Sequence, residues 1–216
     1  MRFKAYALTT VAVVVLAFAA LAAAATIVGT PGDDVLRGTD DADRISALVG
    51  NDHVYARDGG DDVRAGSGDD GVRAGDGSDQ VYGGRGNDVV AGGNGSDRLK
   101  GGSDADEVLG GDGADRASGN RGDDSVSGND GRDSLFGGWG ADRVFGGRGD
   151  DELHALAPDG QPDLLDCGPG DDKAFVLRSE RESTRLVRCE RLYVVVALTS
   201  DQEEGETAEA DAEADE

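Results

Sequence analysis

The chain repeats itself every nine residues from Gly29 to His154 without a gap. Fourteen rows of nine result, among them GGRGNDVVA at 83–91 and GGNGSDRLK at 92–100. We number the places in each row as positions one to nine. A nine-residue period fits neither the face of a helix nor a long strand, but it fits one short strand plus one tight turn per repeat.

Some positions in the rows hardly vary. Position one is always Gly or Ala, and position four is Gly except at Asp41 and Asp104. Position eight is Leu, Ile or Val in every row but one, which has Ala117. Position six is aspartate in all fourteen rows, and these residues are Asp34, Asp43, Asp52, Asp61, Asp70, Asp79, Asp88, Asp97, Asp106, Asp115, Asp124, Asp133, Asp142 and Asp151.

This pattern predicts an all-β solenoid. The end of each row supplies a strand whose position-eight side chain points inward, because strand side chains alternate between two faces. Glycines in the first half of the row suit a turn, because they adopt positive φ at little steric cost. One repeat buries almost nothing, so the repeats must stack. With two rows to a coil, the fourteen rows predict seven coils with turns along two edges.

Stacking would bring the position-six aspartates together. Asp70, Asp88 and Asp106 would follow one edge, while alternate rows would follow the other. Carboxylates less than about 5 Å apart repel one another, so a cation must intervene. Oxygen donors without His or Cys select calcium over zinc or copper, and magnesium demands a tighter octahedron. The alternatives are a solvated acidic surface or glycine-rich disorder, which becomes the expected state without calcium.

Rows such as GGRGNDVVA, GGNGSDRLK and GGRGDDELH resemble the RTX, or haemolysin-type, calcium-binding nonapeptide G-G-x-G-x-D-x-U-x. The resemblance implies a parallel β-roll, a right-handed β-solenoid, with each calcium ion between two stacked turns. The ligands would be the position-six aspartates and main-chain carbonyls of turn residues such as Gly84, Gly86, Gly93 and Gly95. Several ions would bind, at most about twelve in the regular rows.

Some rows depart from the family pattern. Leu48 and Arg57 stand where the second Gly belongs, and Asp41 and Asp104 replace the position-four Gly. Where these positions need positive φ, a side chain costs roughly 1 kcal/mol or more. We therefore expect the fifth to eighth and the last two rows to bind best.

The charge of the chain argues against two classes of partner. The 216 residues include 45 acids and 21 bases, a formal net charge of −24. Nucleic acids and anionic membranes bind through basic residues, which disfavours both. Calcium ions are the predicted partner, while a cell-surface or extracellular partner remains open and its identity unknown.

The first 25 residues have the features of a signal peptide. Arg2 and Lys4 precede an apolar run, and Ala23 and Ala25 fit a cleavage site. The alternative is an uncleaved membrane anchor. We therefore expect a secreted, extracellular protein, with the roll at 26–154.

After His154 the repeat becomes irregular. The stretch 155–166 reads as a fifteenth repeat with an insertion that carries Asp163, and a sixteenth begins at Cys167 with Asp172 as a further candidate calcium ligand. We expect residues 155–200 to form degenerate repeats and a C-terminal cap. In an exported chain, Cys167 and Cys189 favour a disulfide over two free thiols. Residues 201–216 carry nine acids and no base, which predicts an acidic, disordered tail.

The sequence contains no recognisable catalytic constellation. Its two histidines, His53 and His154, fall on outward strand positions, and no zinc spacing or Ser/His/Asp set emerges. Trp139, Phe136 and Phe145 could form a small exposed aromatic patch for a partner or sugar, although the role we favour for them is capping the outer face of the roll. The function predicted is therefore non-enzymatic: a secreted calcium-binding protein that folds on binding calcium. The alternative is a structural or adhesive cell-surface module with the roll as a calcium-rigidified spacer, and an undetected hydrolase is the third hypothesis.

Overall fold

The computed structural model describes residues 24–196, and this part of the chain is built entirely from strands and turns. The predicted signal peptide at 1–25 falls almost wholly outside the described residues, and the predicted tail at 201–216 lies entirely outside them. Within the described part, no helix is long and apolar enough to cross a membrane.

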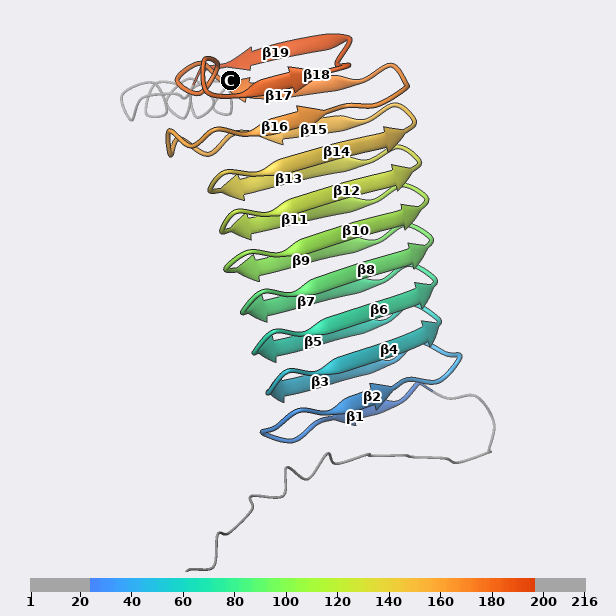
Figure 1. The fold of residues 1–216 in the computed structure, drawn as a ribbon. Coiled ribbons are helices and arrows are strands. Elements are labelled where there is room, and N and C mark those ends of the chain that lie inside the picture. Colours follow the sequence, from blue (N-terminus) through green and yellow to red (C-terminus); the bar gives the residue numbers. More distant parts are fainter. Residues whose placement is uncertain (1–23, 197–216) are drawn as a thin grey trace, which may run out of the picture.

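Within residues 24–196, nineteen strands form two parallel sheets that face each other (Figure 1). The ten-stranded sheet contains β1 (Thr26–Val28), β3 (Arg44–Val49), β5 (Asp62–Ser67), β7 (Gln80–Arg85), β9 (Arg98–Ser103), β11 (Arg116–Arg121), β13 (Ser134–Trp139), β15 (Glu152–Ala155), β17 (Lys173–Leu177) and β19 (Arg191–Val195). The nine-stranded sheet contains β2 (Val35–Arg37), β4 (His53–Asp58), β6 (Gly71–Asp76), β8 (Val89–Asn94), β10 (Glu107–Asp112), β12 (Ser125–Asp130), β14 (Arg143–Arg148), β16 (Leu164–Asp166) and β18 (Arg185–Val187).

The strand register confirms two nonapeptides per coil. Arg98 in β9 pairs with Gln80 in β7 on one side and with Arg116 in β11 on the other, so each residue meets residues 18 places away. The fourteen regular rows form β2 to β15, the seven coils predicted for them, and the whole stack has about nine. The degenerate repeats expected after His154 continue the two sheets, and β1 adds a strand before the first row.

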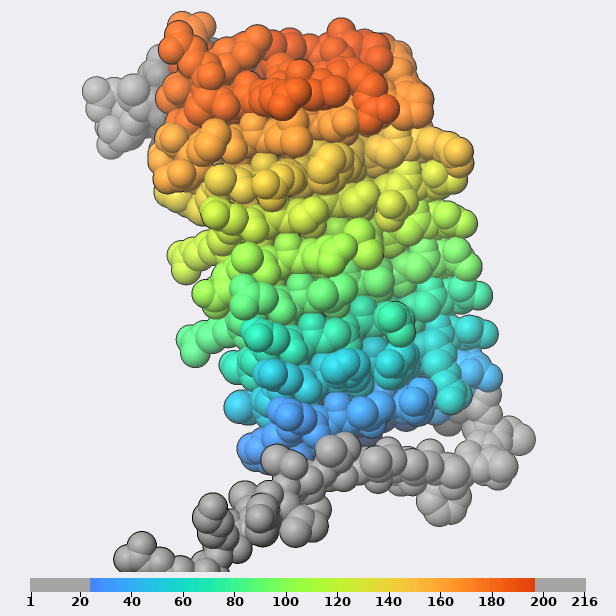
Figure 2. All heavy atoms as spheres, viewed as in Figure 1, coloured from blue at the N-terminus to red at the C-terminus, as the bar shows by residue number. Residues whose placement is uncertain are grey.

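A thin apolar core runs the length of the stack. The coils follow one another without a break in the space-filling view (Figure 2). Position eight points inward as predicted: Leu36, Ile45 and Val54 begin a column of side chains that are at most 1% exposed, and Ala117 belongs to it. Position one also points inward, so Ala47 and Ala56 join the core. Each coil thus adds only a few apolar residues, and the roll is stable only as a stack.

The irregular C-terminal repeats continue the solenoid. Arg143 in β14 pairs with Leu164 in β16, a separation of 21 residues instead of 18, which accommodates three extra residues in the fifteenth repeat. The strands β18 and β19 form the last coil, and Leu192 and Val194 in β19 remain 39% and 44% exposed. Among residues 24–196, no further strand pairs with the outer edge of β19.

The predicted aromatic patch is wrong, because its members lie on different sheets. Phe136 and Trp139 are in β13, whereas Phe145 is in β14 of the opposite sheet. Phe136 instead stacks on His154 at 4.3 Å between ring centroids, and the stack continues through Phe175 to Tyr193. The outward position predicted for His154 is correct, but neighbouring rings cover it.

Candidate metal centre

The turns of the roll require a left-handed backbone at positions two and four. Gly84 and Gly86 have φ of 128° and 111°. The same conformation occurs without glycine at Leu48, Arg57 and Asp104, with φ between 80° and 91°, which is the condition under which we expect strain there. Asp41 is different, because the first two turns do not use positive φ at these positions.

Close stacking is the second reason for glycine. A Cβ added to Gly84 would lie 2.0 Å from the carbonyl oxygen of Gly66, one coil earlier. At Gly86 it would lie 2.3 Å from the carbonyl oxygen of Gly68. The carbonyls at positions two and four therefore point along the stack towards the following turn, which places main-chain oxygens between adjacent coils.

The position-six aspartates form two ladders along the edges of the roll. The amide of Asp70 donates to Oδ1 of Asp88 at 2.9 Å, and the amide of Asp88 donates to Oδ1 of Asp106 at 2.8 Å. Further bonds of the same kind join aspartates 18 residues apart on both edges, from Asp34 to Asp52 through Asp133 to Asp151. All fourteen predicted aspartates are buried, at 0–4% exposure. The grouping along two edges is as predicted.

The second carboxylate oxygen has no partner in most of the ladder. Oδ2 is buried and makes no hydrogen bond within the described structure in Asp52, Asp61, Asp70, Asp79, Asp88, Asp97, Asp106, Asp115, Asp124, Asp133, Asp142, Asp151 and Asp172. A buried acceptor without a partner costs about 1–3 kcal/mol, and more when charged. These unpartnered Oδ2 atoms therefore need a cation or protons to satisfy them.

Main-chain oxygens converge on the same place. The Cβ position of Gly83 is 2.5 Å from Oδ2 of Asp88 and 2.7 Å from the carbonyl oxygen of Gly101, one coil later. Gly92 has the same surroundings, with Oδ2 of Asp97 at 2.2 Å and the carbonyl oxygen of Gly110 at 2.7 Å. Where position one is glycine, a carboxylate oxygen and a carbonyl of the next turn thus lie close to each other.

In the first two aspartates of the ladder, Oδ2 does accept hydrogen bonds. The amide and hydroxyl of Thr30 bond Oδ2 of Asp34, and those of Thr39 bond Oδ2 of Asp43. Both threonines stand at position two, where later rows need positive φ. The ladder therefore divides into two satisfied members at its start and unsatisfied members from Asp52 on.

Burial strongly perturbs the ladder carboxyls. Desolvation raises the pKa of Asp88, Asp106, Asp133 and Asp142 to about 7. It raises the pKa of Asp70, Asp79, Asp115, Asp124 and Asp151 to about 6. Neighbouring carboxylates add to the effect, while the amide of the preceding aspartate opposes it. Without a bound cation, the fold therefore destabilises the ionised form of these aspartates.

The donor chemistry fits a hard cation. In residues 24–196, no three His, Cys, Asp or Glu side chains gather into a group that could hold a metal alone. Carbonyl oxygens from the turns would have to complete the shell, and calcium accepts such mixed, irregular oxygen sets. The groups that could bind the calcium ion are the unpartnered Oδ2 atoms of the aspartates and the turn carbonyls beside them.

Asp163 and Glu190 extend the ladder beyond the predicted set. Asp142 donates its amide to Oδ1 of Asp163, and Asp151 donates to Oδ1 of Asp172, which places both at position six of the late repeats. The amide of Asp172 donates to Oε2 of Glu190 at 3.1 Å. Asp163 was read as part of a repeat but not as a candidate ligand, and Glu190 was missed. Its spacing of 18 from Asp172 was the available signal.

Comparison with protein families agrees with this geometry. The model of the RTX calcium-binding nonapeptide repeat matches residues 24–54, 55–90, 82–117, 91–126 and 118–153, more than half of the chain. The chain belongs to the RTX calcium-binding repeat family. No curated protein matches the sequence. The RTX roll is a structural calcium-binding module, which accounts for oxygen donors that recur with the coil rather than cluster once.

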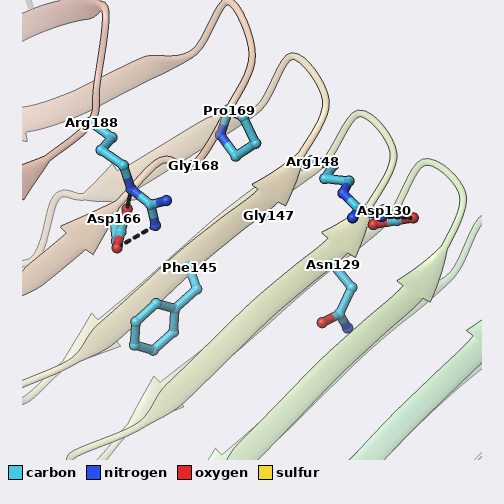
Figure 3. A pocket seen from close by; sticks show the side chains of 9 residues that line it. All are labelled: Asn129, Asp130, Phe145, Gly147, Arg148, Asp166, Gly168, Pro169 and Arg188. Atoms are coloured by element: carbon cyan, nitrogen blue, oxygen red, sulfur yellow. Dashed lines mark hydrogen bonds and ion pairs between the residues drawn. The ribbon is translucent and has the colours of Figure 1, made fainter.

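The RTX roll also has a surface groove near its C-terminal end (Figure 3). Its volume is about 350 Å³, and Phe145, Arg148 and Arg188 lie along it. The guanidinium of Arg188 makes two 2.7 Å hydrogen bonds to Asp166, and Arg148 pairs with Asp130 at 3.4 Å. Both acids of the groove are held in ion pairs, so neither is placed as a general base.

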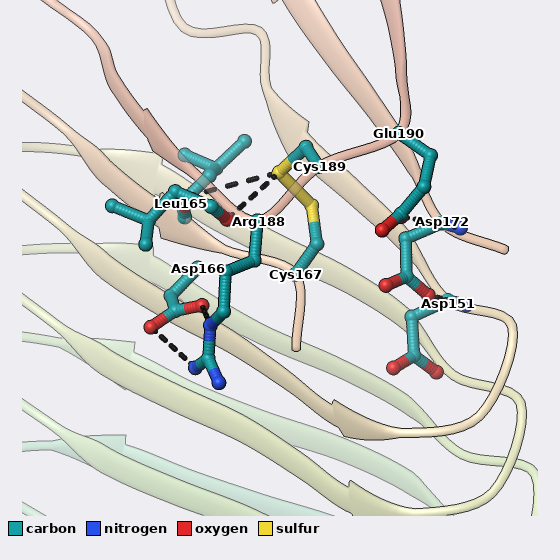
Figure 4. The surroundings of a disulfide bond; sticks show 9 residues. Asp151, Leu165, Asp166, Cys167, Asp172, Arg188, Cys189 and Glu190 are labelled. Carbon is teal, nitrogen blue, oxygen red and sulfur yellow. Dashed lines mark hydrogen bonds and ion pairs between the residues drawn. A yellow bond between two sulfur atoms is a disulfide. The ribbon is translucent and has the colours of Figure 1, made fainter. Parts of the chain in front are cut away.

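The disulfide predicted between Cys167 and Cys189 is present, with the Cα atoms 5.0 Å apart (Figure 4). Cys167 follows β16 and is fully buried, while Cys189 follows β18. The amide of Cys167 also donates to the carbonyl of Val187. The bridge thus joins neighbouring coils and fixes the last coil of the RTX roll to the rest.

Proposed function

We propose that this protein is a secreted calcium-binding protein whose roll folds as calcium ions bind between stacked turns. The observation that carries the proposal is the column of buried, unpartnered Oδ2 atoms from Asp52 to Asp172. At neutral pH these oxygens belong to carboxylates that burial penalises when they are ionised. A bound calcium ion supplies the positive charge and the coordination positions that the ladder lacks.

The ladder aspartates and the turn carbonyls would share the work of binding. In each turn, Oδ1 is already used in the ladder, which leaves Oδ2 as the free donor, as in Asp88. The carbonyl of Gly101 shares the space beside that oxygen. The positive φ of Gly84 and Gly86 orients the turn so that carbonyls face the gap between coils. Asp34 and Asp43 are the weakest candidate ligands, because threonines already satisfy them.

Secretion would make calcium the signal for folding. RTX repeat proteins are typically extracellular, where calcium is plentiful, and extracellular calcium modules bind with Kd values of about 10⁻⁴ to 10⁻³ M. Because calcium binds the folded turns and not the unfolded chain, it stabilises the roll by mass action. The protein would stay unfolded at low calcium and fold outside, without any catalytic activity.

Circular dichroism of the mature chain tests the proposal. With chelator we expect a largely unstructured spectrum, and with excess calcium a strand spectrum. Magnesium at the same concentration serves as the control and should leave the spectrum unstructured, because it demands a tighter octahedron. The same strand signal in chelator and in calcium would refute coupled folding.

A further inference from the structure

In the middle of the roll, the two outer faces carry opposite charge. In the ten-stranded sheet, β7, β9, β11 and β13 contain no acid and five bases: Arg85, Arg98, Lys100, Arg116 and Arg121. In the opposite sheet, β6, β8, β10 and β12 contain one base, Arg73, and four acids: Asp76, Glu107, Asp112 and Asp130. A chain with net charge −24 therefore concentrates positive charge on one face.

The five bases are exposed and have no acidic partner among the described residues. Arg44 and Arg64, on the same sheet, share Asp62, whereas none of the five takes part in an ion pair. Arg116 lies over the ring of Phe136, with 4.3 Å between the guanidinium carbon and the ring centroid. This face therefore holds positive charge that nothing in the described structure neutralises.

The middle of this face is hollowed. A groove of about 550 Å³ is lined by Arg98, Lys100, Arg116, Phe136 and their neighbours. A second of about 290 Å³ is lined by Arg98 and Lys100 together with Arg64 and Tyr82. Because the two share Arg98 and Lys100, they form one depression across β5 to β13, which we call the cationic groove.

The end of the described chain lies on the same sheet as the cationic groove. Residues 201–216 read DQEEGETAEADAEADE, with nine acids and no base. The strand β19 ends at the same edge of the ten-stranded sheet as Arg121 in β11 and Arg85 in β7 (Figure 1). From β19 to β9 the distance is five strand spacings, about 24 Å. The twenty residues after Val196 can extend to roughly 66 Å, more than enough to reach it.

We propose that the acidic segment 201–216 binds in the cationic groove of its own chain, with its carboxylates on Arg98, Lys100 and Arg116. Tethering favours this segment over a separate partner, because a short linker gives an effective concentration in the millimolar range. A second copy of the chain is disfavoured, because each copy carries a large negative charge.

Zero-length cross-linking of the full chain in calcium tests this contact. A carbodiimide joins carboxylates to nearby amines, and Lys100 is the only amine of the groove. At low ionic strength we expect an amide between Lys100 and an acid of 201–216 within monomers. Lys173, whose Nζ is 2.6 Å from Oε1 of Glu152, provides the internal positive control. In 1 M NaCl, where charges are screened beyond about 3 Å, the yield should fall at least tenfold.

Matched variants separate the groove from general electrostatics. Arg98→Gln with Arg116→Gln should abolish the link to Lys100, whereas Arg73→Gln with Arg143→Gln on the opposite sheet should preserve it. Strand signal confirms that each variant is folded. The proposal fails if Lys173 links to Glu152 while Lys100 links to nothing in 201–216. It also fails if the link occurs only in covalent dimers, which would assign the groove to a second copy.

Discussion

The main-chain amide of Asp88 donates a 2.8 Å hydrogen bond to Oδ1 of Asp106, one coil further along the stack. The same aspartate, Asp106, holds its second oxygen buried without a partner. One residue type therefore both joins successive coils and opposes their stacking when it is ionised. This conflict explains why the roll should depend on a cation, and the predictions below exploit it.

Replacing Asp88 separates its two roles. Asp88→Asn keeps an acceptor for the amide of Asp70 and removes the charge, so we expect a more stable calcium-free roll and at least tenfold weaker calcium binding at that turn. Asp88→Ala also removes the acceptor and should destabilise the roll by about 1–3 kcal/mol. Calcium titration and urea unfolding measure both effects. The exposed Asp112→Asn is the control, and equal effects at both positions would contradict the assignment.

Acid should favour the calcium-free fold. Burial raises the pKa of Asp88, Asp106, Asp133 and Asp142 to about 7, above the value near 4 expected in the unfolded chain. Such groups penalise folding only when ionised, so stability is greatest below the unfolded pKa and is lost as pH rises towards 7. Circular dichroism of calcium-stripped protein should therefore show strand content increasing from pH 7 to pH 5.

The same acidification should weaken calcium binding, because protons compete with the cation for the ladder oxygens. Acid has the opposite effect on stability at His154, because burial lowers the pKa of this residue to about 4. This single group is outweighed by the many aspartates of the ladder. A steady loss of strand content on acidification without calcium would contradict the role given to the ladder.

Glycine at position two should stabilise the roll where φ is positive. Gly93 has φ 120°, and its Cβ would lie 2.1 Å from the carbonyl oxygen of Gly75, so Gly93→Ala should destabilise the calcium-loaded roll by about 2 kcal/mol or more. Leu48→Gly should stabilise it by up to about 1 kcal/mol, because Leu48 holds φ 89°. Gly71→Ala is the control, since its nearest neighbour is 3.9 Å away. Denaturant unfolding in calcium ranks the three, and similar losses at Gly71 and Gly93 would be inconsistent with this explanation.

The disulfide should stabilise only the end of the roll. Cys167→Ala with Cys189→Ala opens a 22-residue loop, which costs about 3 kcal/mol in the chain-entropy model. Because repeats contact only their neighbours, hydrogen exchange should accelerate in β16 to β19 and stay unchanged in β5 to β9. Uniform acceleration along the whole roll would show that it unfolds as one unit instead.

Much of the fold was readable from the sequence because one short period controls it. Position eight predicted the buried column from Leu36 to Leu153, and the 18-residue coil predicted which aspartates are neighbours. The coils beyond the fourteen rows were only partly readable, because β1, β18 and β19 pair through backbone without the nonapeptide signature. Backbone pairing needs only extended residues in register, which leave little trace in composition.

The candidate site was predicted in outline but not in detail. All fourteen aspartates lie in the two ladders, yet Thr30 and Thr39 satisfy the first two, an interaction that depends on the local turn shape. Glu190 replaces an aspartate because its longer side chain still reaches the amide of Asp172. Phe145 was grouped with Phe136 although they are one row apart, which places them on opposite sheets. Spacing predicts which side chains are neighbours, while hydrogen-bond partners depend on side-chain length and φ.

Calorimetric titration of calcium into the calcium-stripped chain, with strand content followed in parallel, tests calcium-coupled folding most directly. We expect several ions to bind per chain, at most about twelve, with heat released in step with the gain of strand. Binding of no calcium at millimolar concentration, or binding to a chain already folded in chelator, would contradict the role proposed for the aspartate ladder.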